Sequence, residues 1–488
     1  MKKILILIII LGVSLSCSEH AGNLDDKLTS YERLFEIVSK AEKTNHFIEL
    51  DTLGISVENR IIPYLKISND SFDDAAKVNV MVFAQQHGNE QSGKEAALLL
   101  TEKIASGELD YLFEKINLIL VPQMNPDGSE KDSRRNGSGI DLNRNHLLLS
   151  EPETIGLHKI FNEYLPEVTL DVHEYNPYSK SWMEEGYIKN FDEQLGVMTN
   201  PNIDKKLIGV AKNRVVPFID STVTENGFSF NEYILGGPPG IERMRFSTVD
   251  INDGRNSFGI YNTLSFILEG KNGKNSADNI DHRKRGQYFA IKGLLDFVYS
   301  NTREIKSAVH SSRGRLIDDG RSGKIVIRME HVKGSNSIDS LSYLSLASER
   351  DTALFIPEFH DSVKTILSVD VPKAYLIHVS DSSLLSFLKH HSIKYEKYEP
   401  SSGDEIFQYK ILSSEKSIDE ELENYYVRVE RVKLPPEKIT QKYFSIPTDQ
   451  KAGKMLVQAL EPQSMLGLIQ YEDFEYLLKD DYSILRLE

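Results

Sequence analysis

The stretch "VFAQQHGNEQSGKEAALLL" (residues 82–100) decides the fold. An apolar run leads to His87, Glu90 follows three residues later, and helical spacing begins directly after it. A strand that passes through a polar turn into a helix is the repeating unit of α/β proteins. H-x-x-E also suits two metal ligands, but a chain with 13 His contains about one such pattern by chance. A second copy, His46–Glu49, lacks turn residues, so His87 counts as a ligand only with partners elsewhere.

The same alternation continues along the chain. Apolar runs typical of buried strands lie at 78–84, 116–122, 167–173 and 263–269, after two earlier strand candidates at 47–57 and 60–68. Helical spacing marks 24–44, 90–105, 151–165, 203–223 and about 284–300. These elements predict an α/β fold whose mostly parallel or mixed central sheet has helices on both faces.

The texture changes after about residue 305. Short alternating strands are broken by prolines, and "SDSSLLSFLKHH" (380–391) is the one evident helix. We therefore predict one domain at 27–305 and a second, α+β domain or pair of small modules at 306–488.

Four strands place polar residues at their carboxyl ends. His87, Asn125, His173 and Glu269 each lie at or just past the end of an apolar run. In open α/β sheets that edge is where ligands bind. The pattern predicts that these residues meet at one rim.

The N-terminus is typical of an exported protein. Lys2 and Lys3 precede a short apolar run, and Cys17, the only cysteine of the chain, follows it. The run is too short for a bilayer span and matches a signal peptide. Residues 1–17 thus predict a lipoprotein signal with lipid attached to Cys17, and 18–26 a tether; the alternative is an ordinary cleaved signal. Disulfides within the chain are excluded.

Charge limits the partners. Lys and Arg number 57 against 73 Asp and Glu, a net charge of −16. Nucleic acids and anionic membrane surfaces attract an excess of Lys and Arg. We expect no nucleic-acid partner and membrane contact only through a lipid anchor, while the oligomeric state stays open.

One block of sequence carries a resemblance. "NPDGSEKDSRRNGSGIDLNRNH" (125–146), taken in order with "HGNE", "LDVHEY" and "SFILEG", resembles the zinc metallocarboxypeptidases of the carboxypeptidase A type. The similarity covers roughly residues 50–300. "GRNSFGIYNTLSFILE" (254–269) and the stretch at 444–468 are similar to secreted bacterial members.

The resemblance implies one zinc ion per chain. His87, Glu90 and His173 would be its ligands, with a fourth position open for water. Asp141 would accept a hydrogen bond from His87 and so fix its tautomer. Glu269 would be the general base that takes a proton from the attacking water. Without the other motifs, we would interpret Glu269 as a solvated residue at the end of a strand.

Arginines would recognise the substrate. Asn143 and Arg144 match the family's pair that binds the terminal carboxylate, which guanidinium holds in a two-pronged fork. Arg134 would stabilise the oxyanion, with Arg135 as the fallback. Arg255 is a further candidate for holding substrate.

The match has gaps. The family's substrate-contacting tyrosine has no counterpart, because Tyr261 precedes Glu269 by only eight residues. Glu174 follows His173 at a position where the family more often has a small residue. Its side chain either adds negative potential near the metal ion or points away from it. We expect His146 either behind the metal ligands or at the surface, and His390 and His391 at the surface.

The sequence predicts an exported zinc metallocarboxypeptidase, anchored by lipid in the periplasm or at the cell surface, that cleaves residues from peptides with a free C-terminal carboxylate. One alternative is amide hydrolysis on the same scaffold, acting on cell-wall peptides or acylated amino acids. The other is an inactive binding lipoprotein.

Overall fold

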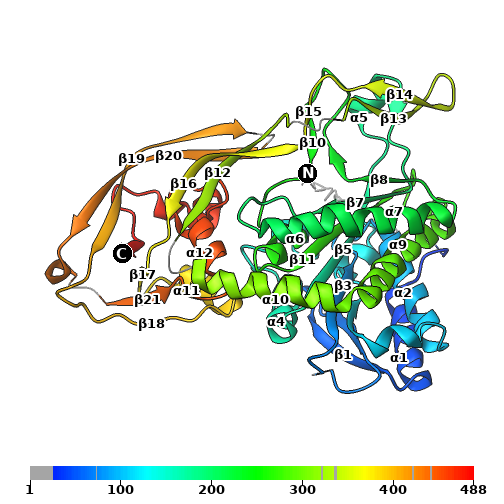
Figure 1. Cartoon of the computed structure of the whole chain (residues 1–488), viewed down its shortest axis with the longest axis horizontal. Helices are drawn as coiled ribbons and strands as arrows, with labels where there is room; N and C mark the ends of the chain where they lie inside the picture. The colour runs from blue at the N-terminus through cyan, green and yellow to red at the C-terminus, as the bar shows by residue number, and fades with distance from the viewer. Residues whose placement is uncertain (1–25, 73, 320–322, 335–337, 420–421, 440–441) are drawn as a thin grey trace, which may run out of the picture.

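The computed structural model describes residues 26–488, apart from 73, 320–322, 335–337, 420–421 and 440–441 (Figure 1). The predicted signal peptide with Cys17, and nearly all of the predicted tether, lie outside the described residues. Within the described part, no helix is both long and apolar enough to span a bilayer.

An eight-stranded mixed sheet forms the centre of the first part, in the order β1-β2-β4-β3-β5-β11-β7-β8. The strands are β1 (Ile48–Ile55), β2 (Ile61–Ile67), β3 (Val78–Ala84), β4 (Ile116–Val121), β5 (Val168–Tyr175), β7 (Glu193–Val197), β8 (Phe230–Glu232) and β11 (Leu264–Lys271). Strands β4, β3, β5 and β11 run parallel. Strands β1 and β2 pair antiparallel with their neighbours, and β7 pairs antiparallel with β11 and parallel with β8. The inner strands are buried along almost their whole length, as their continuous apolar runs require.

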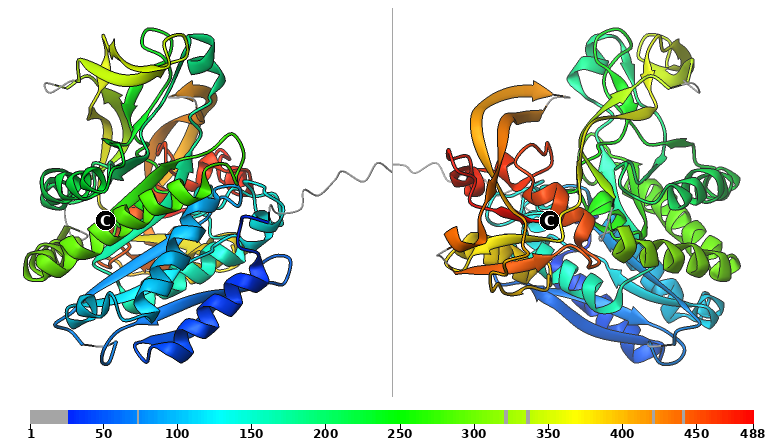
Figure 2. Two further views of the ribbon diagram at one scale, coloured as in Figure 1. Left: turned by 90° about the vertical axis from the view of Figure 1, so that its right-hand side faces the viewer. Right: turned by 60° about the vertical axis from the view of Figure 1, so that its left-hand side comes forward.

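Helices cover both faces of this sheet (Figure 2). One face carries α1 (Tyr31–Thr44), α2 (Gln91–Ala105), α7 (Val216–Glu225) and α9 (Ile280–Ser300), which pack on one another in the pairs α1–α2, α2–α9 and α7–α9. The other carries α4 (Pro152–Tyr164) and the short α8 (Gly254–Gly259), joined by the stacked rings of Phe161 and Phe258 at 4.4 Å. The predicted α/β fold with a covered mixed sheet is confirmed.

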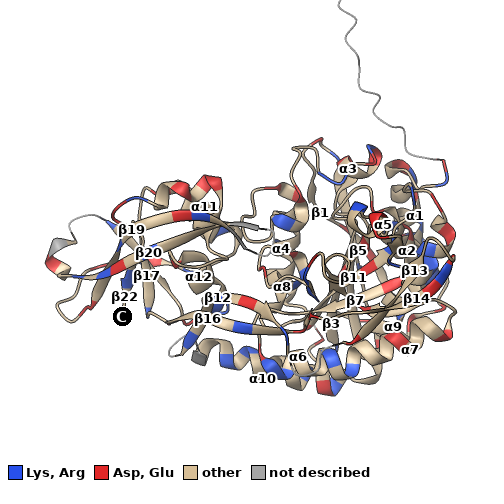
Figure 3. Cartoon of the chain, turned by 90° about the horizontal axis from the view of Figure 1, so that it is seen from above, with Lys and Arg blue, Asp and Glu red and all other residues tan. Residues whose placement is uncertain are grey.

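Helix α10 (Thr302–Asp319) follows α9 and runs across residue 305, near the predicted domain boundary. Its buried positions Ile305, Val309 and Leu316 recur at helical spacing. The charged residues on the rest of the helix mark its outer side in Figure 3. It contacts α6 (Lys205–Val210), β3 and α9 of the first part and also α12 (Gly453–Leu460) of the later part, so it packs between the two.

The later part is rich in β-structure, and its largest sheet has the order β18-β21-β17-β22-β19-β20. Its strands are β17 (Ala374–His378), β18 (Glu396–Lys397), β19 (Ile406–Asp419), β20 (Leu422–Leu434), β21 (Tyr443–Pro447) and β22 (Leu485–Leu487). Helices α11 (Ser382–His390) and α12 (Gly453–Leu460) accompany this sheet. The predicted helix at 380–391 is confirmed as α11.

Strands from the later part also pair with strands from the first. The strand β12 (Lys324–Val332) pairs with β16 (Ser362–Asp370), and between them the chain reaches back over the main sheet (Figure 1). There β13 (Ser340–Ser345) pairs with β6 (Tyr187–Ile188), and β15 (Phe359–His360) with β10 (Met244–Phe246). The hairpin partner of β13 is β14 (Arg350–Phe355), and that of β10 is β9 (Ile234–Leu235). These pairings join segments that are distant in sequence.

Candidate metal centre and active site

The turn after β3 holds its shape by close packing. Gly88 lies against the N-P-D-G turn, where an added Cβ would come within 2.1 Å of the carbonyl carbon of Gly128. Asn125 accepts a hydrogen bond from the backbone N–H of Gly128 (2.8 Å) and donates to the carbonyl of Gln86 (3.0 Å). The two motifs therefore fix each other, and a side chain at position 88 would separate them.

Three side chains converge at the carboxyl edge of the sheet. Nδ1 of His87 lies 2.7 Å from Oε1 of Glu90, and Nδ1 of His173 lies 2.9 Å from Oε2 of the same carboxylate. The two Nδ1 atoms are 3.1 Å apart. All three residues are buried, and their ligand atoms lie within 4.8 Å of one another. Two imidazole nitrogens and one carboxylate are the donor set of a catalytic zinc site that keeps a position open.

Each histidine is held from behind by a carboxylate. Nε2 of His87 donates to Asp141 (3.0 Å), and Nε2 of His173 lies 2.8 Å from Asp171. With the Nε2 protons engaged in this way, both Nδ1 lone pairs face Glu90. Asp141 was expected in this place; Asp171 was not, although it lies two residues before His173 on the same face of β5.

The charges around this cluster favour a cation. Burial disfavours a charged imidazole, but Asp171 and Glu90 outweigh it and raise the pKa of His173 well above its usual value. Burial would likewise raise the pKa of Glu90, yet His87 and His173 lower it far below the usual range. The carboxylates of Glu90 and Asp171 thus favour a positive charge at this buried place, which a divalent metal ion would supply.

Glu269 stands directly beside the cluster. The parallel register of β11 and β5 places it opposite His173. Its side chain is buried, and burial raises its pKa to about 7, with Glu90 adding to the rise and His173 opposing it. A carboxyl group with a pKa near neutrality can both take up and release a proton.

Tyr233 is a residue that the sequence did not reveal. It lines the cavity together with Glu269, whose carboxylate raises the pKa of the Tyr233 hydroxyl further after burial, so the hydroxyl stays protonated. It comes from the segment between β8 and β9, much farther ahead of Glu269 in the sequence than Tyr261. Tyr261 packs against Phe161 instead, with 5.5 Å between the ring centroids. No local pattern distinguishes Tyr233; only the folded chain brings it to Glu269.

The adjacent side chains of Arg134 and Arg135 have different partners. Arg134 donates through Nε to Asp141 (3.1 Å), and its Nη1 lies 3.4 Å from Oε1 of Glu90. Arg135 is exposed and donates to the carbonyl of Gly139 (2.9 Å). Only Arg134 lines the cavity at the cluster.

Asn143 and Arg144 line the same cavity, from a short 3₁₀ turn at Leu142–Arg144. Asn143 accepts from the backbone N–H of Gly254 (2.8 Å). Arg255 lies behind the wall instead: it is fully buried and pairs with Asp253 (3.0 Å). Arg255 therefore supports a residue of the wall rather than forming it.

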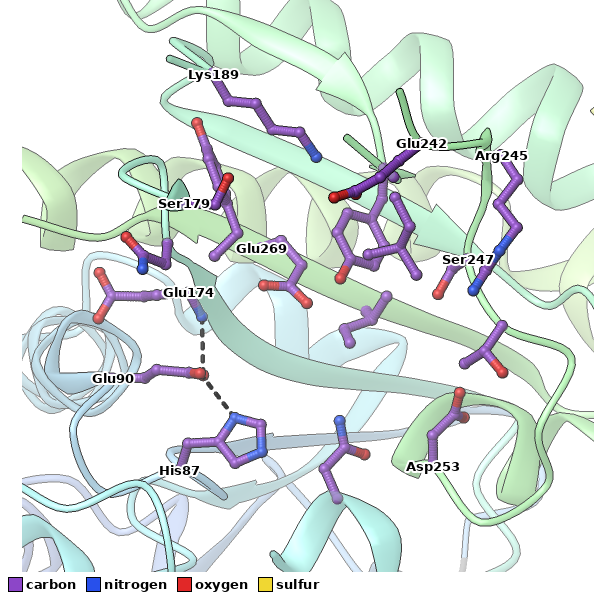
Figure 4. Close-up of a pocket in the computed structure, with 18 of the residues that line it drawn as sticks. His87, Glu90, Glu174, Ser179, Lys189, Glu242, Arg245, Ser247, Asp253 and Glu269 are labelled. Carbon is purple, nitrogen blue, oxygen red and sulfur yellow. Dashed lines mark hydrogen bonds and ion pairs between the residues drawn. The ribbon is translucent and has the colours of Figure 1, made fainter. Parts of the chain in front are cut away.

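Glu174 does not add free charge to the site. Its carboxylate accepts from Arg283 (2.6 and 2.8 Å) and from the backbone N–H of Ser92 (3.1 Å). Its own N–H donates to Glu90 at 3.0 Å, one of the contacts drawn in Figure 4. The residue orients a carboxylate of the cluster while its own charge is neutralised.

The cavity has a volume of about 380 Å³. His87 and Glu90 lie at one side of it in Figure 4, Glu269 in the middle, and Arg245, Ser247 and Asp253 on the side away from the two ligands. The far wall comes from the segments that carry β9 and β10 and from Trp182, whose indole N–H donates to the carbonyl of Gly236 (3.2 Å).

Two histidine expectations have definite outcomes. His146 is buried and donates to Gln86 (2.8 Å), which in turn donates to Asp171 (2.8 Å), so it belongs to the support of the site. The expectation of a surface position is wrong for His391, which is only 4% exposed. It is buried because the later part packs against α4.

The geometry of the site by itself defines a class of protein. A buried His, Glu and His donor set, a carboxylic acid of near-neutral pKa beside it and arginines in one cavity are the parts of a metal-dependent hydrolase. Residues 36–184 match the family described as zinc carboxypeptidase, Peptidase_M14. The chain contains a zinc carboxypeptidase domain.

Relatives extend over more of the chain. Carboxypeptidase 2 of Trichophyton rubrum is 22% identical over 479 residues, which cover 94% of this chain and 87% of the fungal protein. Carboxypeptidase D of Rattus norvegicus is 32% identical over 155 residues, or 27% of this chain and 11% of that protein. The crystal structure of carboxypeptidase A from Helicoverpa armigera aligns with a TM-score of 0.43 and 18% identity, covering 57% of this chain and 75% of that one.

Proposed function

We propose that the protein is an exported zinc carboxypeptidase that hydrolyses the last peptide bond of peptides with a free C-terminal carboxylate. The observation that carries the proposal is the shared cavity, which is lined by His87, Glu90, Glu269 and Arg144. A guanidinium in the cavity suits a substrate that ends in a free carboxylate, as peptides do, although cell-wall peptides and acylated amino acids can carry one too.

His87, Glu90 and His173 would hold the ion through Nδ1, a carboxylate oxygen and Nδ1. When bound, zinc supplies a Lewis acid that polarises the scissile carbonyl and acidifies a water molecule. Glu269 accepts the proton of the attacking water and delivers it to the leaving amine nitrogen. Tyr233 orients that carboxylate through its hydroxyl group.

Two arginines act on the substrate in this proposal. Arg144, with Asn143, binds the terminal carboxylate and so sets which peptide bond reaches Glu269. Arg134 stabilises the negative charge that develops on the carbonyl oxygen. Its hydrogen bond to Asp141 holds the guanidinium beside the ligand cluster.

The proposal extends to export and organisation. Residues 1–17 would be a signal peptide, and Cys17 a site of lipid attachment that anchors the protein at a membrane. Residues 27–305 would carry the chemistry, with one zinc ion per chain, and 306–488 would be an accessory part. Kinship with the secreted bacterial branch remains a prediction.

The test uses purified protein from residue 24 onward and a mixed peptide library. We expect product ladders shortened one residue at a time from the C-terminus, abolished by a chelator and restored by zinc, when products are read by mass spectrometry. Bound zinc without shortening would redirect the proposal to cell-wall peptides or acylated amino acids. A protein that binds no zinc would be a binding lipoprotein with a relic site.

A further inference from the structure

The loop that carries Arg144 is held from two sides. One side faces the cavity, and the other is in contact with the later part of the chain. From there, Nε2 of His391 donates to the carbonyl of Leu147 (2.7 Å), and Nδ1 of His390 donates to the carbonyl of Leu149 (2.8 Å). Both histidines lie at the C-terminal end of α11, which packs against α4.

A third contact reaches the backbone of Arg144 itself. The buried amide of Asn252 donates to the carbonyl of Arg144 (2.6 Å) and to the hydroxyl oxygen of Tyr471 (2.9 Å). Its oxygen accepts from the N–H of Leu147 (2.6 Å). One side chain thus ties the arginine, the loop behind it and the later part of the chain together, with all of its hydrogen-bonding groups in use.

The loop needs such support. Only the single turn at Leu142–Arg144 is regular, and Leu149 has a backbone φ of 48°, in the left-handed region that a leucine rarely adopts. Left-handed residues persist where surrounding contacts hold them. The contact from His390 falls on the carbonyl of Leu149 itself.

His391 is suited to this task as a neutral donor. Burial lowers its pKa to about 4, so the ring is uncharged and carries one N–H. Its ring packs edge-on to that of His158 in α4, with centroids 5.6 Å apart. The donor is therefore fixed in place relative to the first part of the chain.

We propose that the later part of the chain is a brace that positions Arg144 for the substrate carboxylate, with Tyr471 and His391 as positioning residues. The proposal rests on the function proposed above and gives residues 306–488 a role in it. A bidentate guanidinium contact depends on placement within a few tenths of an ångström, and the Arg144 side chain moves with its own backbone. Loss of the brace weakens carboxylate binding and leaves the ligand cluster intact.

The experiment compares two tyrosine hydroxyls in the full-length, zinc-loaded protein. Tyr471→Phe removes the acceptor for Asn252, while Tyr482→Phe removes a hydroxyl that donates to Leu460 (2.8 Å) within the later part, away from the loop. KM and kcat are measured on a peptide with a free C-terminus, together with zinc content and Tm. We expect Tyr471→Phe to raise KM about three- to tenfold with kcat within about twofold and zinc content unchanged, and Tyr482→Phe to leave KM unchanged.

Two substitutions of His391 keep the proposal testable if a tyrosine variant fails to fold. His391→Gln keeps an N–H that can reach Leu147, and His391→Leu does not. We expect the leucine variant to raise KM and the glutamine variant to restore most of the wild-type value. Equal KM values in wild type, Tyr471→Phe and His391→Leu would overturn the brace alone. A wild-type protein that binds zinc but shortens no peptide would overturn the proposed function, and the brace with it.

Discussion

The two sides of the cavity are built in different ways. The side with the metal ligands comes from the ends of β3, β5 and β11, adjacent parallel strands whose register fixes the spacing of every side chain. The rest of the lining comes from the short strands β9 and β10 and from the loop that follows Asp141, up to residue 149, and these segments contact residues more than a hundred positions later in the chain. In the proposed function, the residues that carry the chemistry lie at strand ends of the sheet. The residues that would bind the substrate lie on segments that depend on contacts with other segments.

The largest effect should come from the rigid side. His173→Ala removes a ligand and leaves Asp171 and Glu90 as close, buried carboxylates without a cation between them. We expect loss of bound zinc and turnover at the limit of detection, measured by metal analysis and peptide assay. His310→Ala, which changes an exposed histidine paired with Glu167, is the control. Full zinc occupancy in His173→Ala would contradict the ligand assignment.

Glu269→Gln separates binding from proton transfer on the same side. The amide has the shape of the carboxylate but cannot accept the proton of the attacking water. We expect unchanged zinc content and a kcat lower by about 10²–10⁴-fold. Glu225→Gln, an exposed residue in α7, should behave as wild type. Normal turnover in Glu269→Gln would remove the residue from the role of base.

Arg144→Ala tests the recognition side. Charge-assisted hydrogen bonds are worth about 1.5–3 kcal/mol, so we expect kcat/KM for free-carboxylate peptides to fall about ten- to a hundredfold. C-terminally amidated peptides should lose far less, since they offer no carboxylate. Arg135→Ala, in the same loop but facing Gly139, is the matched control. Equal losses on both kinds of peptide would break the distinction between the two sides.

The same difference explains what the sequence could predict. The ends of apolar runs hold His87, Glu90, His173 and Glu269. A parallel sheet brings the carboxyl ends of its strands to one edge, so the sequence alone predicts that these residues lie close together. Asp171 could have been found too, because it shares a strand face with His173.

The recognition side had no comparable signal. Tyr233 reaches Glu269 only because β8 and β9 fold over the sheet, and Arg255 lies behind Asp253 because the α8 segment turns it inward. The burial of His391 depends on packing between parts of the chain that no local pattern relates. Hydrophobic periodicity and motif spacing do not reveal which distant segments of the chain pack against each other.

The smallest effect should come from the outermost support of the recognition side. Tyr343 in β13 stacks on Trp182, with centroids 4.2 Å apart and planes at 20°, and Trp182 lines the cavity. Tyr343→Leu loses the aromatic contact, worth about 0.5–1.5 kcal/mol beyond area burial, so we expect a lower denaturation midpoint and a KM changed less than about threefold.

Tyr299→Leu provides the matched comparison, since its ring meets that of the exposed Tyr111 edge-on at 5.5 Å, away from the cavity. If both variants lose the same stability and only Tyr343→Leu alters KM, the later strands shape the pocket through Trp182. If KM stays constant in both, β13 stabilises the fold without reaching the substrate, and the support of the recognition side ends at β9, β10 and the 141–149 loop.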